Sequence, residues 1–266
     1  MEEQILKILE ERFLLSNREI GKIIGKSRST VQYYMNKLNI HRDRKLMQKN
    51  NNTCREKKID ITERAEQIIL GSVLGDGYID KYRKPENTKL LLNSCLLITQ
   101  GIKQENYVKY KKELLEKENI KCHLTFTSKD KCKPHYIKGI LVKENGRYTL
   151  KTQRNVVFNR YRNLFYFTNK TKCVNKYLYK LKALGLAIWY MDDGYKEKNY
   201  YRLCTNSFTF KEVFLLQKIL KHNFNIDSTV VNSNLKQPVL NIRAKSSKIF
   251  KNLIFPYVCD SMKYKL

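Results

Sequence analysis

The sequence lacks the features of membrane-spanning and exported proteins. No run of 18 or more apolar residues occurs in its 266 residues, and no signal-peptide pattern follows Met1. We therefore expect a protein of the cytoplasm, associated with the nucleoid, or of an organelle matrix. Hydrophobic residues make up 42% of the chain, which is enough to predict a globular core rather than disorder.

Cysteine does not occur in the pattern of a disulfide framework. The seven cysteines are odd in number and scattered, which favours a reducing compartment. Cys122-His123, followed by Cys132 and His135, has ligand types that zinc uses. No CxxC pair stands beside this cluster, and neighbours on a strand point to opposite faces. We therefore favour a buried thiol and polar loop residues there over a zinc site.

Acidic residues are scarce relative to basic ones. The chain has 25 Asp and Glu against 53 Lys and Arg, a net charge of +28 that is spread along its whole length. Self-repulsion makes such an excess unfavourable for folding alone, so the partner should be a polyanion. Double-stranded DNA is the partner we expect, and an anionic membrane surface is the weaker alternative.

The first 45 residues have the periodicity of a small helical domain. Apolar residues recur at helical spacing in three stretches, at about 2–12, 17–25 and 28–39. Ser16 or Asn17 is placed to cap the second helix, and Ser27 to start the third. The polar and basic residues 46–60 are typical of a linker.

Two short helices joined by a tight turn resemble a helix-turn-helix DNA-binding module. The residues of the third helix that are expected to be exposed and to contact bases and phosphates are Arg28, Ser29, Gln32, Tyr33 and Asn36. The alternative is a helical appendage that packs on the main domain.

Two apolar runs each end in an aspartate followed by glycine, Ile69–Gly77 and Leu186–Gly194. Their acids, Asp76 and Asp193, are 117 positions apart, so the motif looks duplicated. The C-terminal end of a helix has orphan carbonyls and a negative dipole end, where a carboxylate favours a divalent cation. The pattern predicts a carboxylate pair suited to phosphodiester cleavage, against the alternative of two capped helix ends.

Small residues in these runs predict close packing of the two helices. Gly71 and Gly75, four positions apart, would let the helices approach, with Ala183 and Ala187 doing the same on the partner. Gly77 and Gly194 suit the left-handed conformation that ends many helices.

From Ile61 onward the order of predicted elements repeats, which divides residues 61–266 into halves of about 61–170 and 171–266. After its apolar helix, the first half has strands and helices at 90–99, 105–118, 124–128, 148–152 and 156–165. The corresponding segments of the second half are 201–206, 211–222, 228–232, 239–243 and 247–255. Apolar residues alternate with polar ones along the strands, so one sheet face can pack on helices while the other, with Arg243, meets DNA.

These motifs resemble the LAGLIDADG homing endonucleases of the single-chain, two-motif kind, over roughly Ile61–Leu266. Trp189–Gly194, Asn206–Phe210 and Met262–Leu266 resemble one subgroup of mitochondrial intron endonucleases. The first acid of the family motif is apolar here, as Leu74 and Met191. The resemblance implies an α+β fold: a pseudo-twofold αββαββα repeat that forms a DNA-binding saddle, with the all-α helix-turn-helix domain outside it.

The resemblance also implies the activity, a site-specific endonuclease that makes metal-dependent double-strand breaks in a long DNA target as a monomer. Asp76 and Asp193 would each hold Mg²⁺, in two or more ions that Mn²⁺ can replace. The carbonyls of Gly75 and Asp192 would assist them. A DNA-binding regulator that does not cut, or an RNA maturase, is the alternative on the same fold.

Two lysines complete the implied site. Lys265, in the closing Tyr-Lys-Leu, matches a lysine that the subgroup places near one active site. Lys172 matches its partner in the other site, with Lys170 as the alternative. We expect Tyr264 and Leu266 to act as apolar anchors that dock the tail.

Overall fold

A computed structural model describes residues 1, 4–5, 8, 15–37, 59–80, 93–132, 135–137, 140–142, 145–167, 171–233 and 237–266. The side chains of 135–137, 140–142 and 167 are not among the described parts. The chain divides into two compact units, one of residues 1–58 with 81–93 and the other of residues 59–80 with 94–266. No helix in the described part of the chain is long and apolar enough to cross a membrane.

The smaller unit contains the predicted helix pair, α2 (Asn17–Ile24) and α3 (Arg28–Lys37). Ser16 caps α2 in a capping box with Glu19, and Gly25 ends the helix at φ 66°. The Ser27 hydroxyl accepts the N–H of Thr30 at 3.1 Å and caps α3, as the sequence predicts. The buried core of this unit consists of Ile5, Ile20, Val31 and Met35. Most of the predicted helix at 2–12 and of the linker lies outside the described residues.

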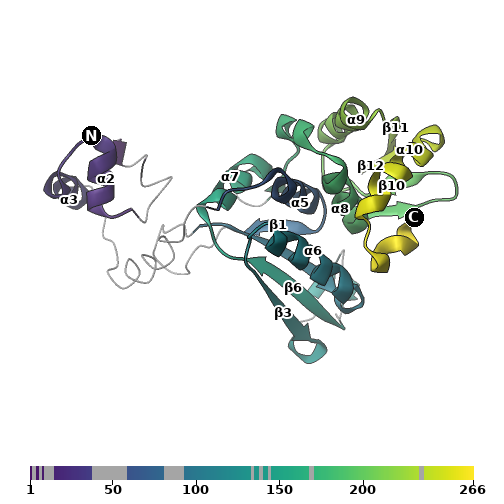
Figure 1. Ribbon diagram of the computed structural model, residues 1–266, viewed down its shortest axis with the longest axis horizontal. Coiled ribbons are helices and arrows are strands. Elements are labelled where there is room, and N and C mark those ends of the chain that lie inside the picture. The colour runs from purple at the N-terminus through teal and green to yellow at the C-terminus, as the bar shows by residue number, and fades with distance from the viewer. Residues whose placement is uncertain are drawn as a thin grey trace. The chain divides into compact units, whose positions relative to one another are not determined.

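The larger unit has the repeated αββαββα order that the resemblance implies (Figure 1). The first half contains α5 (Glu63–Leu74), β1 (Gly77–Asp80), β2 (Cys95–Gly101), α6 (Glu105–Lys117), β3 (Cys122–Ser128), β6 (Gly146–Thr152) and α7 (Val156–Phe165). The second half contains α8 (Ala183–Asp193), β9 (Gly194–Lys196), β10 (Tyr201–Leu203), α9 (Phe210–Phe224), β11 (Ser228–Asn232), β12 (Pro238–Ile242) and α10 (Ala244–Ile254). The expected fold class is confirmed.

Each half has its own four-stranded antiparallel sheet, with matching strand order. The first sheet runs β1-β2-β6-β3, and the second, read from its equivalent edge, runs β9-β10-β12-β11. The residues after the two Asp-Gly motifs form the edge strands β1 and β9. The sequence pattern did not predict these two strands. Both strands are short, and Gly77 and Gly194 pair with Ile98 and Leu203 in equivalent registers.

Short elements connect this frame. They are β4 (His135–Ile137) with β5 (Ile140–Val142), β7 (Tyr166–Phe167) with β8 (Thr171–Lys172), and 3-10 turns at Ile102–Gln104, Lys129–Lys131, Lys176–Lys180, Phe255–Tyr257 and Asp260–Lys265. The β7-β8 pair is tied to the first sheet, because the Tyr166 hydroxyl accepts the N–H of Ile79 at 2.9 Å. This contact fixes the backbone that carries Lys172.

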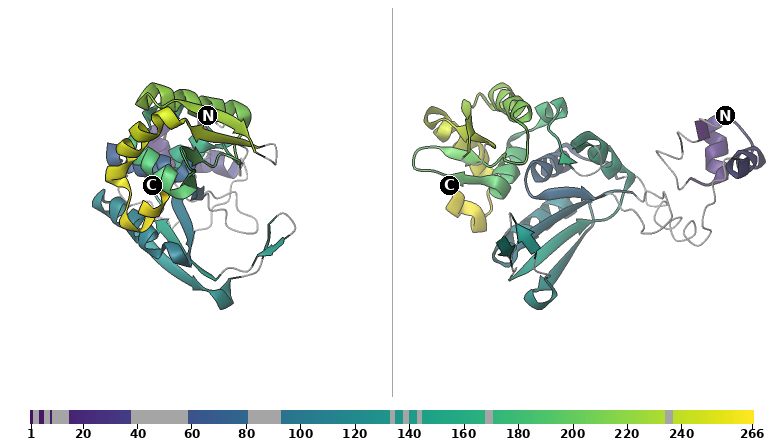
Figure 2. Two further views of the ribbon diagram at one scale, coloured as in Figure 1. Left: turned by 90° about the vertical axis from the view of Figure 1, so that its right-hand side faces the viewer. Right: turned by 180° about the vertical axis from the view of Figure 1, so that it is seen from behind.

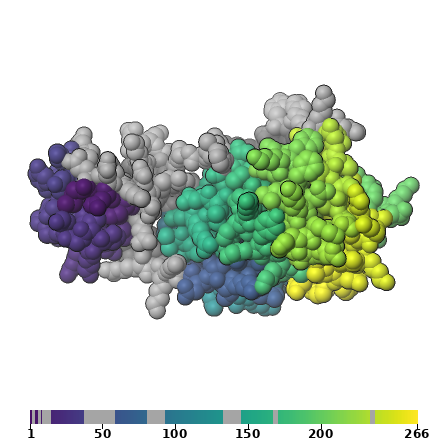
Figure 3. Space-filling view, turned by 90° about the horizontal axis from the view of Figure 1, so that it is seen from above, coloured from purple at the N-terminus to yellow at the C-terminus, as the bar shows by residue number. Residues whose placement is uncertain are grey.

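The two halves meet along α5 and α8, which lie side by side in the middle of the unit (Figures 1 and 2). The first half, blue to teal, and the second half, green to yellow, form one continuous body in the space-filling view (Figure 3). Both helices are almost wholly buried, in one core that runs through the unit. Burial on this scale is the main stabilising contribution to the paired helices.

Glycines permit this close approach, but not all in the expected way. A Cβ on Gly71 would lie 2.3 Å from the Gly185 carbonyl oxygen, so Gly185, and not Ala183 or Ala187, is the small residue opposite Gly71. The left-handed conformation expected of Gly77 and Gly194 is wrong, since neither has a positive φ. They are needed for space: added Cβ atoms would meet the Ser72 carbonyl oxygen at 2.6 Å and the Tyr190 ring at 2.1 Å.

Candidate active site

The ends of α5 and α8 bring the two motif aspartates into one site. Asp76 follows the end of α5 and is exposed, and Asp193 is the last residue of α8 and is half-buried. Burial, together with the charges of Asp76 and Asp192, raises the pKa of Asp193 to about 7. The ionised form of Asp193 is therefore disfavoured when no cation is bound.

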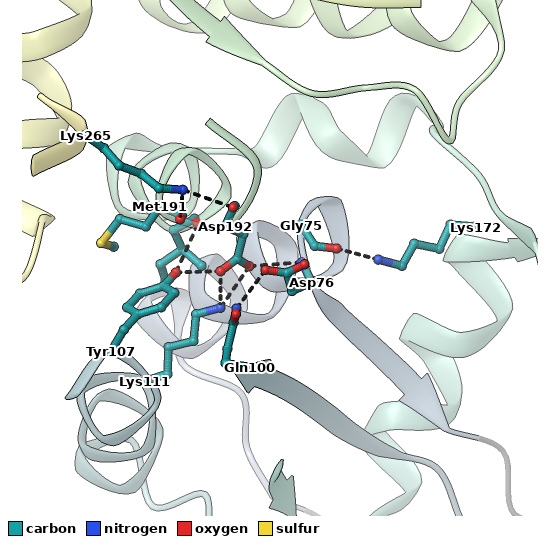
Figure 4. A network of polar contacts seen from close by, with 10 residues as sticks. Gly75, Asp76, Gln100, Tyr107, Lys111, Lys172, Met191, Asp192 and Lys265 are labelled. Carbon is teal, nitrogen blue, oxygen red and sulfur yellow. Dashed lines mark hydrogen bonds and ion pairs between the residues drawn. The ribbon is translucent and has the colours of Figure 1, made fainter. Parts of the chain in front are cut away.

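A lysine approaches the motif backbone of each half (Figure 4). The Nζ of Lys172 donates to the carbonyl oxygen of Gly75 at 2.5 Å. The Nζ of Lys265 donates to the carbonyl oxygens of Met191 and Asp192 at 2.6 and 3.2 Å. Burial lowers the pKa of both lysines, while the neighbouring aspartates oppose that shift. The predicted lysines thus lie at equivalent points, whereas Lys170 is outside the described residues.

The C-terminal segment that carries Lys265 is docked, with Leu266 as an anchor as expected but with Met262 in place of Tyr264. Tyr264 is 72% exposed and anchors nothing, whereas Met262 is buried and Leu266 is partly buried against the core. The Tyr190 hydroxyl donates to the Lys265 carbonyl oxygen, and Lys196 Nζ reaches that of Leu266 at 2.7 Å. The 3-10 turn at Asp260–Lys265 has one side that faces the core. The apolar anchor on that side is Met262, three residues before Lys265.

Asp192 has a second role that the sequence analysis missed. Its carboxylate is buried and accepts hydrogen bonds from two residues of α6. Lys111 Nζ donates at 2.6 and 2.8 Å, and the Tyr107 hydroxyl donates at 2.7 Å. It also accepts the backbone N–H of Asp76 at 3.2 Å, across the boundary between the halves. One signal for this was present: Lys111 interrupts the apolar stripe of α6.

Gln100 is a further residue of the site that the motifs did not indicate. Its Nε2 donates to Asp76 Oδ2 at 2.7 Å from strand β2, which pairs with β1 beside the motif (Figure 4). A glutamine in an alternating strand carries no distinctive sequence signal, so only the pairing of β1 with β2 identifies it. The contact orients the first carboxylate.

The residue set fits a divalent cation. Carboxylate and carbonyl oxygens are the ligands that Mg²⁺ and Mn²⁺ prefer, and both kinds are present at each helix end. Among the described residues no three His, Cys, Asp or Glu side chains lie together as a complete metal site. An ion held by Asp76 or Asp193 would therefore take further ligands from water and from a bound phosphate.

The other predicted residues belong to α3 of the smaller unit and to the start of α10. On α3, all five expected contact residues are exposed: Arg28, Ser29, Gln32, Tyr33 and Asn36. Gln32 accepts from Asn17 at 2.6 Å and donates to Asn36 at 2.9 Å, which fixes its amide. Arg243 is exposed at the start of α10, just beyond β12 rather than within it.

The zinc alternative gains no support from the described residues of its cluster. The Cys122 thiol donates to the Ile120 carbonyl oxygen at 3.3 Å, and the Cys132 thiol to that of Thr127 at 3.8 Å. The His135 side chain lies outside the described part. Burial raises the pKa of Cys122 to about 12, which disfavours the thiolate that zinc would bind.

Two protein families and several curated relatives match parts of this chain. Residues 66–250 match the LAGLIDADG DNA endonuclease family, and residues 2–39 match a winged helix-turn-helix DNA-binding family. The chain is 28% identical to the cytochrome b mRNA maturase bI2 of Saccharomyces cerevisiae, over 75% of this chain and 46% of that protein. It is 26% identical to the probable intron-encoded endonuclease 1 of Wickerhamomyces canadensis, over 76% and 83% of the two chains. The chain thus spans about half the length of the bI2 maturase.

Solved structures agree at the level of the fold. The homing endonuclease I-WcaI bound to its DNA recognition sequence has a TM-score of 0.62 and 22% identity, covering 87% of this chain and 96% of that one. The complex of I-DmoI with DNA and Mn has a TM-score of 0.50 and 16% identity, covering 74% and 99%. The family match covers more than half of the chain and includes both Asp-Gly motifs. The chain belongs to the LAGLIDADG DNA endonuclease family.

Proposed function

We propose that this protein is a site-specific endonuclease that makes double-strand breaks in DNA with the help of Mg²⁺ or Mn²⁺. The observation that carries the proposal is the pair of equivalent helix ends, each with an aspartate and a lysine, brought together by packing of α5 on α8. Two equivalent half-sites suit the two antiparallel strands of a duplex.

Asp76 and Asp193 would hold Mg²⁺ through their carboxylates, and the ion would supply activation of water and stabilisation of the leaving oxygen. Gln100 keeps the Asp76 carboxylate oriented through its contact at 2.7 Å. The Gly75 and Asp192 carbonyls, which accept Lys172 and Lys265 in this structure, would become further oxygen ligands when those ammonium groups turn to the phosphate. Burial and the charges of Asp76 and Asp192 raise the pKa of Asp193, and a bound cation would offset both effects.

Lys172 and Lys265 act on the reacting phosphate. Their ammonium groups lie at the motif backbone, where charge develops on phosphate oxygens during cleavage. Their lowered pKa values bring them closer to neutrality than exposed lysines, which suits the polarisation of a water molecule. Lys172 follows α7, the last helix of the first half, and contacts the first motif, whereas Lys265 near the C-terminus contacts the second.

Target binding rests on exposed residues that take no part in the chemistry. The exposed residues of α3 and Arg243 are proposed DNA contacts, and the net charge of +28 supplies the electrostatic attraction to the duplex. One chain contains both half-sites, so a monomer suffices. A chain with intron-encoded relatives is proposed to work where its intron is found, in a nucleoid or an organelle matrix.

The test is cleavage of a randomised duplex library with Mg²⁺, followed by sequencing of the cut ends. Wild-type protein should produce paired cuts at one recognition sequence, and the Asp76→Asn, Asp193→Asn double variant should produce none. Binding and footprinting without any cutting, over a range of Mg²⁺ and Mn²⁺ concentrations, would instead identify a DNA-binding regulator.

A second candidate function is RNA maturation, which the similarity to the bI2 maturases favours. It would use the same basic fold to stabilise a structured intron rather than to cut DNA. Splicing of the intron that encodes the chain, measured with and without the protein, separates the two activities. The double Asn variant should retain maturase activity, since splicing chemistry belongs to the intron.

A further inference from the structure

The two half-sites are not equivalent at the residue that precedes each catalytic aspartate. In the first motif this residue is Gly75, and in the second it is Asp192. A Cβ on Gly75 would lie 2.4 Å from the Cβ of Asp192 and 2.5 Å from its Oδ2. The side chain of Asp192 therefore fills the space left by the missing side chain of Gly75.

Asp192 reaches the first half-site from the second half. Its Oδ2 accepts the backbone N–H of Asp76 at 3.2 Å, so a carboxylate of one motif fixes the chain at the metal-binding residue of the other. The first motif has no side chain at the equivalent position that could accept the backbone N–H of Asp193. Only the second motif therefore supports the other in this way.

A buried lysine keeps this carboxylate in place. Lys111 and Asp192 have fully buried side chains, and Nζ lies 2.6 and 2.8 Å from the two carboxylate oxygens. The Tyr107 hydroxyl is a second donor at 2.7 Å, and its ring lies 4.6 Å from the Lys111 Nζ (Figure 4). With the Asp76 amide, the carboxylate has three different donor groups in a dry environment.

The lysine also breaks the pseudo-symmetry of the scaffold. Val108, Lys111, Leu114 and Leu115 are the buried residues of α6 that share the spacing of the buried residues of α9, which are Val213, Leu216, Ile219 and Leu220. Lys111 thus takes the place that Leu216 has in the second half. A well-packed apolar residue is often at least as stabilising as a buried ion pair, so stability alone does not account for Lys111.

We propose that Lys111 and Tyr107 are positioning residues for the first half-site, acting through Asp192 on the backbone of Asp76. This inference rests on the proposed function and adds that the two DNA strands are cut with unequal dependence on α6. The physical reason is that catalysis depends on placement of the carboxylate to within a fraction of an ångström. No equivalent device supports the second half-site in the described residues.

Strand-resolved cleavage of the recognition sequence tests the proposal, with each strand labelled separately. Lys111→Met should slow one strand about 10- to 100-fold more than the other. The affected strand should be the one that Lys172→Met slows, because Lys172 contacts Gly75. Lys112→Met is the matched control: it removes the same charge from the neighbouring, partly exposed residue, which pairs with Glu116. It should leave both strands unchanged.

Lys111→Met leaves Asp192 buried without its cation and can impair folding, so a milder pair of variants is included. Tyr107→Phe removes only the hydroxyl that donates to Asp192. Tyr110→Phe, the control, removes a hydroxyl that donates to the Tyr257 carbonyl oxygen at 2.9 Å. Tyr107→Phe should slow the same strand selectively, by a smaller factor than Lys111→Met, and Tyr110→Phe should not. Equal slowing of both strands, or selective slowing of the other strand, overturns the proposal.

Amide hydrogen exchange at Asp76, measured by NMR without DNA or metal, decides the inference independently of activity. Exchange should accelerate in Tyr107→Phe and stay at the wild-type rate in Tyr110→Phe. Unchanged exchange in both variants overturns the proposed positioning. A wild-type protein that binds DNA but never cuts refutes the proposed function, and the exchange result then still decides whether α6 positions Asp76.

Discussion

The Nζ of Lys172 lies 2.5 Å from the carbonyl oxygen of Gly75, at the last turn of the first motif helix. A cation is favoured at this position, because the carbonyls at a helix end lack hydrogen-bond partners and the C-terminal end of the helix dipole is negative. Lys265 repeats the arrangement at Met191 and Asp192. Both half-sites therefore join a lysine that follows the last helix of the repeat to the motif helix that begins the repeat.

We predict that Lys265→Met and Lys172→Met each slow cleavage by one to two orders of magnitude, roughly 1.4 kcal/mol in activation free energy per tenfold. Each ammonium serves one half-site, so each variant should slow mainly one strand, and the two variants opposite strands. Nicked circles should accumulate from a supercoiled target. Wild-type cleavage rates on both strands would show that the substituted lysine is only a surface charge.

Asp76→Asn and Asp193→Asn should each abolish double-strand cleavage while DNA binding persists. The amide is a much poorer ligand for Mg²⁺ than the carboxylate, whereas binding depends on many phosphate contacts. Gel-shift affinity and cleavage of the same duplex, measured side by side, separate the two effects. Full cutting by either variant would contradict the assigned site.

The raised pKa of Asp193 predicts a pH-dependent response to metal. With a pKa of about 7 in the folded protein against 3.8 ordinarily, the folded state retains a proton that the unfolded chain releases. Stability from this group therefore falls as the pH rises from about 4 to about 7. Mg²⁺ binds the ionised form and offsets that loss, so it should raise the Tm more at pH 8 than at pH 5. Asp193→Asn should weaken this difference, and equal shifts in the wild-type protein at both pH values would contradict it.

Gly71→Ala should destabilise the larger unit by about 1–3 kcal/mol, because the added methyl group overpacks a helix interface. The obstacle is the backbone oxygen of Gly185 at 2.3 Å, which cannot rotate away as a side chain could. Gly101→Ala is the control, since no atom lies within 4 Å of its added Cβ. Thermal unfolding should show a drop of roughly 2–4 °C per kcal/mol for the first variant and almost none for the second.

Removal of residues 1–45 should shorten the DNA footprint at one end and leave cleavage intact at saturating protein. Arg28 and Tyr33 are exposed on α3, so Arg28→Ala with Tyr33→Ala should reproduce much of the loss in affinity. Footprinting of the three proteins on one target makes the comparison. An unchanged footprint in the truncated protein would show that the small unit does not contact the target.

Much of the fold could be predicted from the sequence because local patterns of residues determine it. The apolar runs ending in Asp-Gly, the repeated order of helices and strands, and the cap at Ser27 depend on neighbours in the chain. Several segments, including Val156–Phe165 and Ser228–Asn232, have the predicted bounds. The edge strands after each Asp-Gly were not assigned because they are three or four residues long and owe their form to pairing.

The sequence by itself determined the duplicated carboxylates and the family and predicted a polyanionic partner, since charge, spacing and motif are read from the chain alone. Only the tertiary structure decided that Asp192 is buried against Lys111, that Gln100 reaches Asp76 and that Met262 anchors the tail. Lys111 and Asp192 are 81 positions apart, and a lysine within a helix appears solvent-exposed until its neighbours are known. Their contact exists because the packing of α5, α6 and α8 removes water from both charges, leaving each as the other's partner.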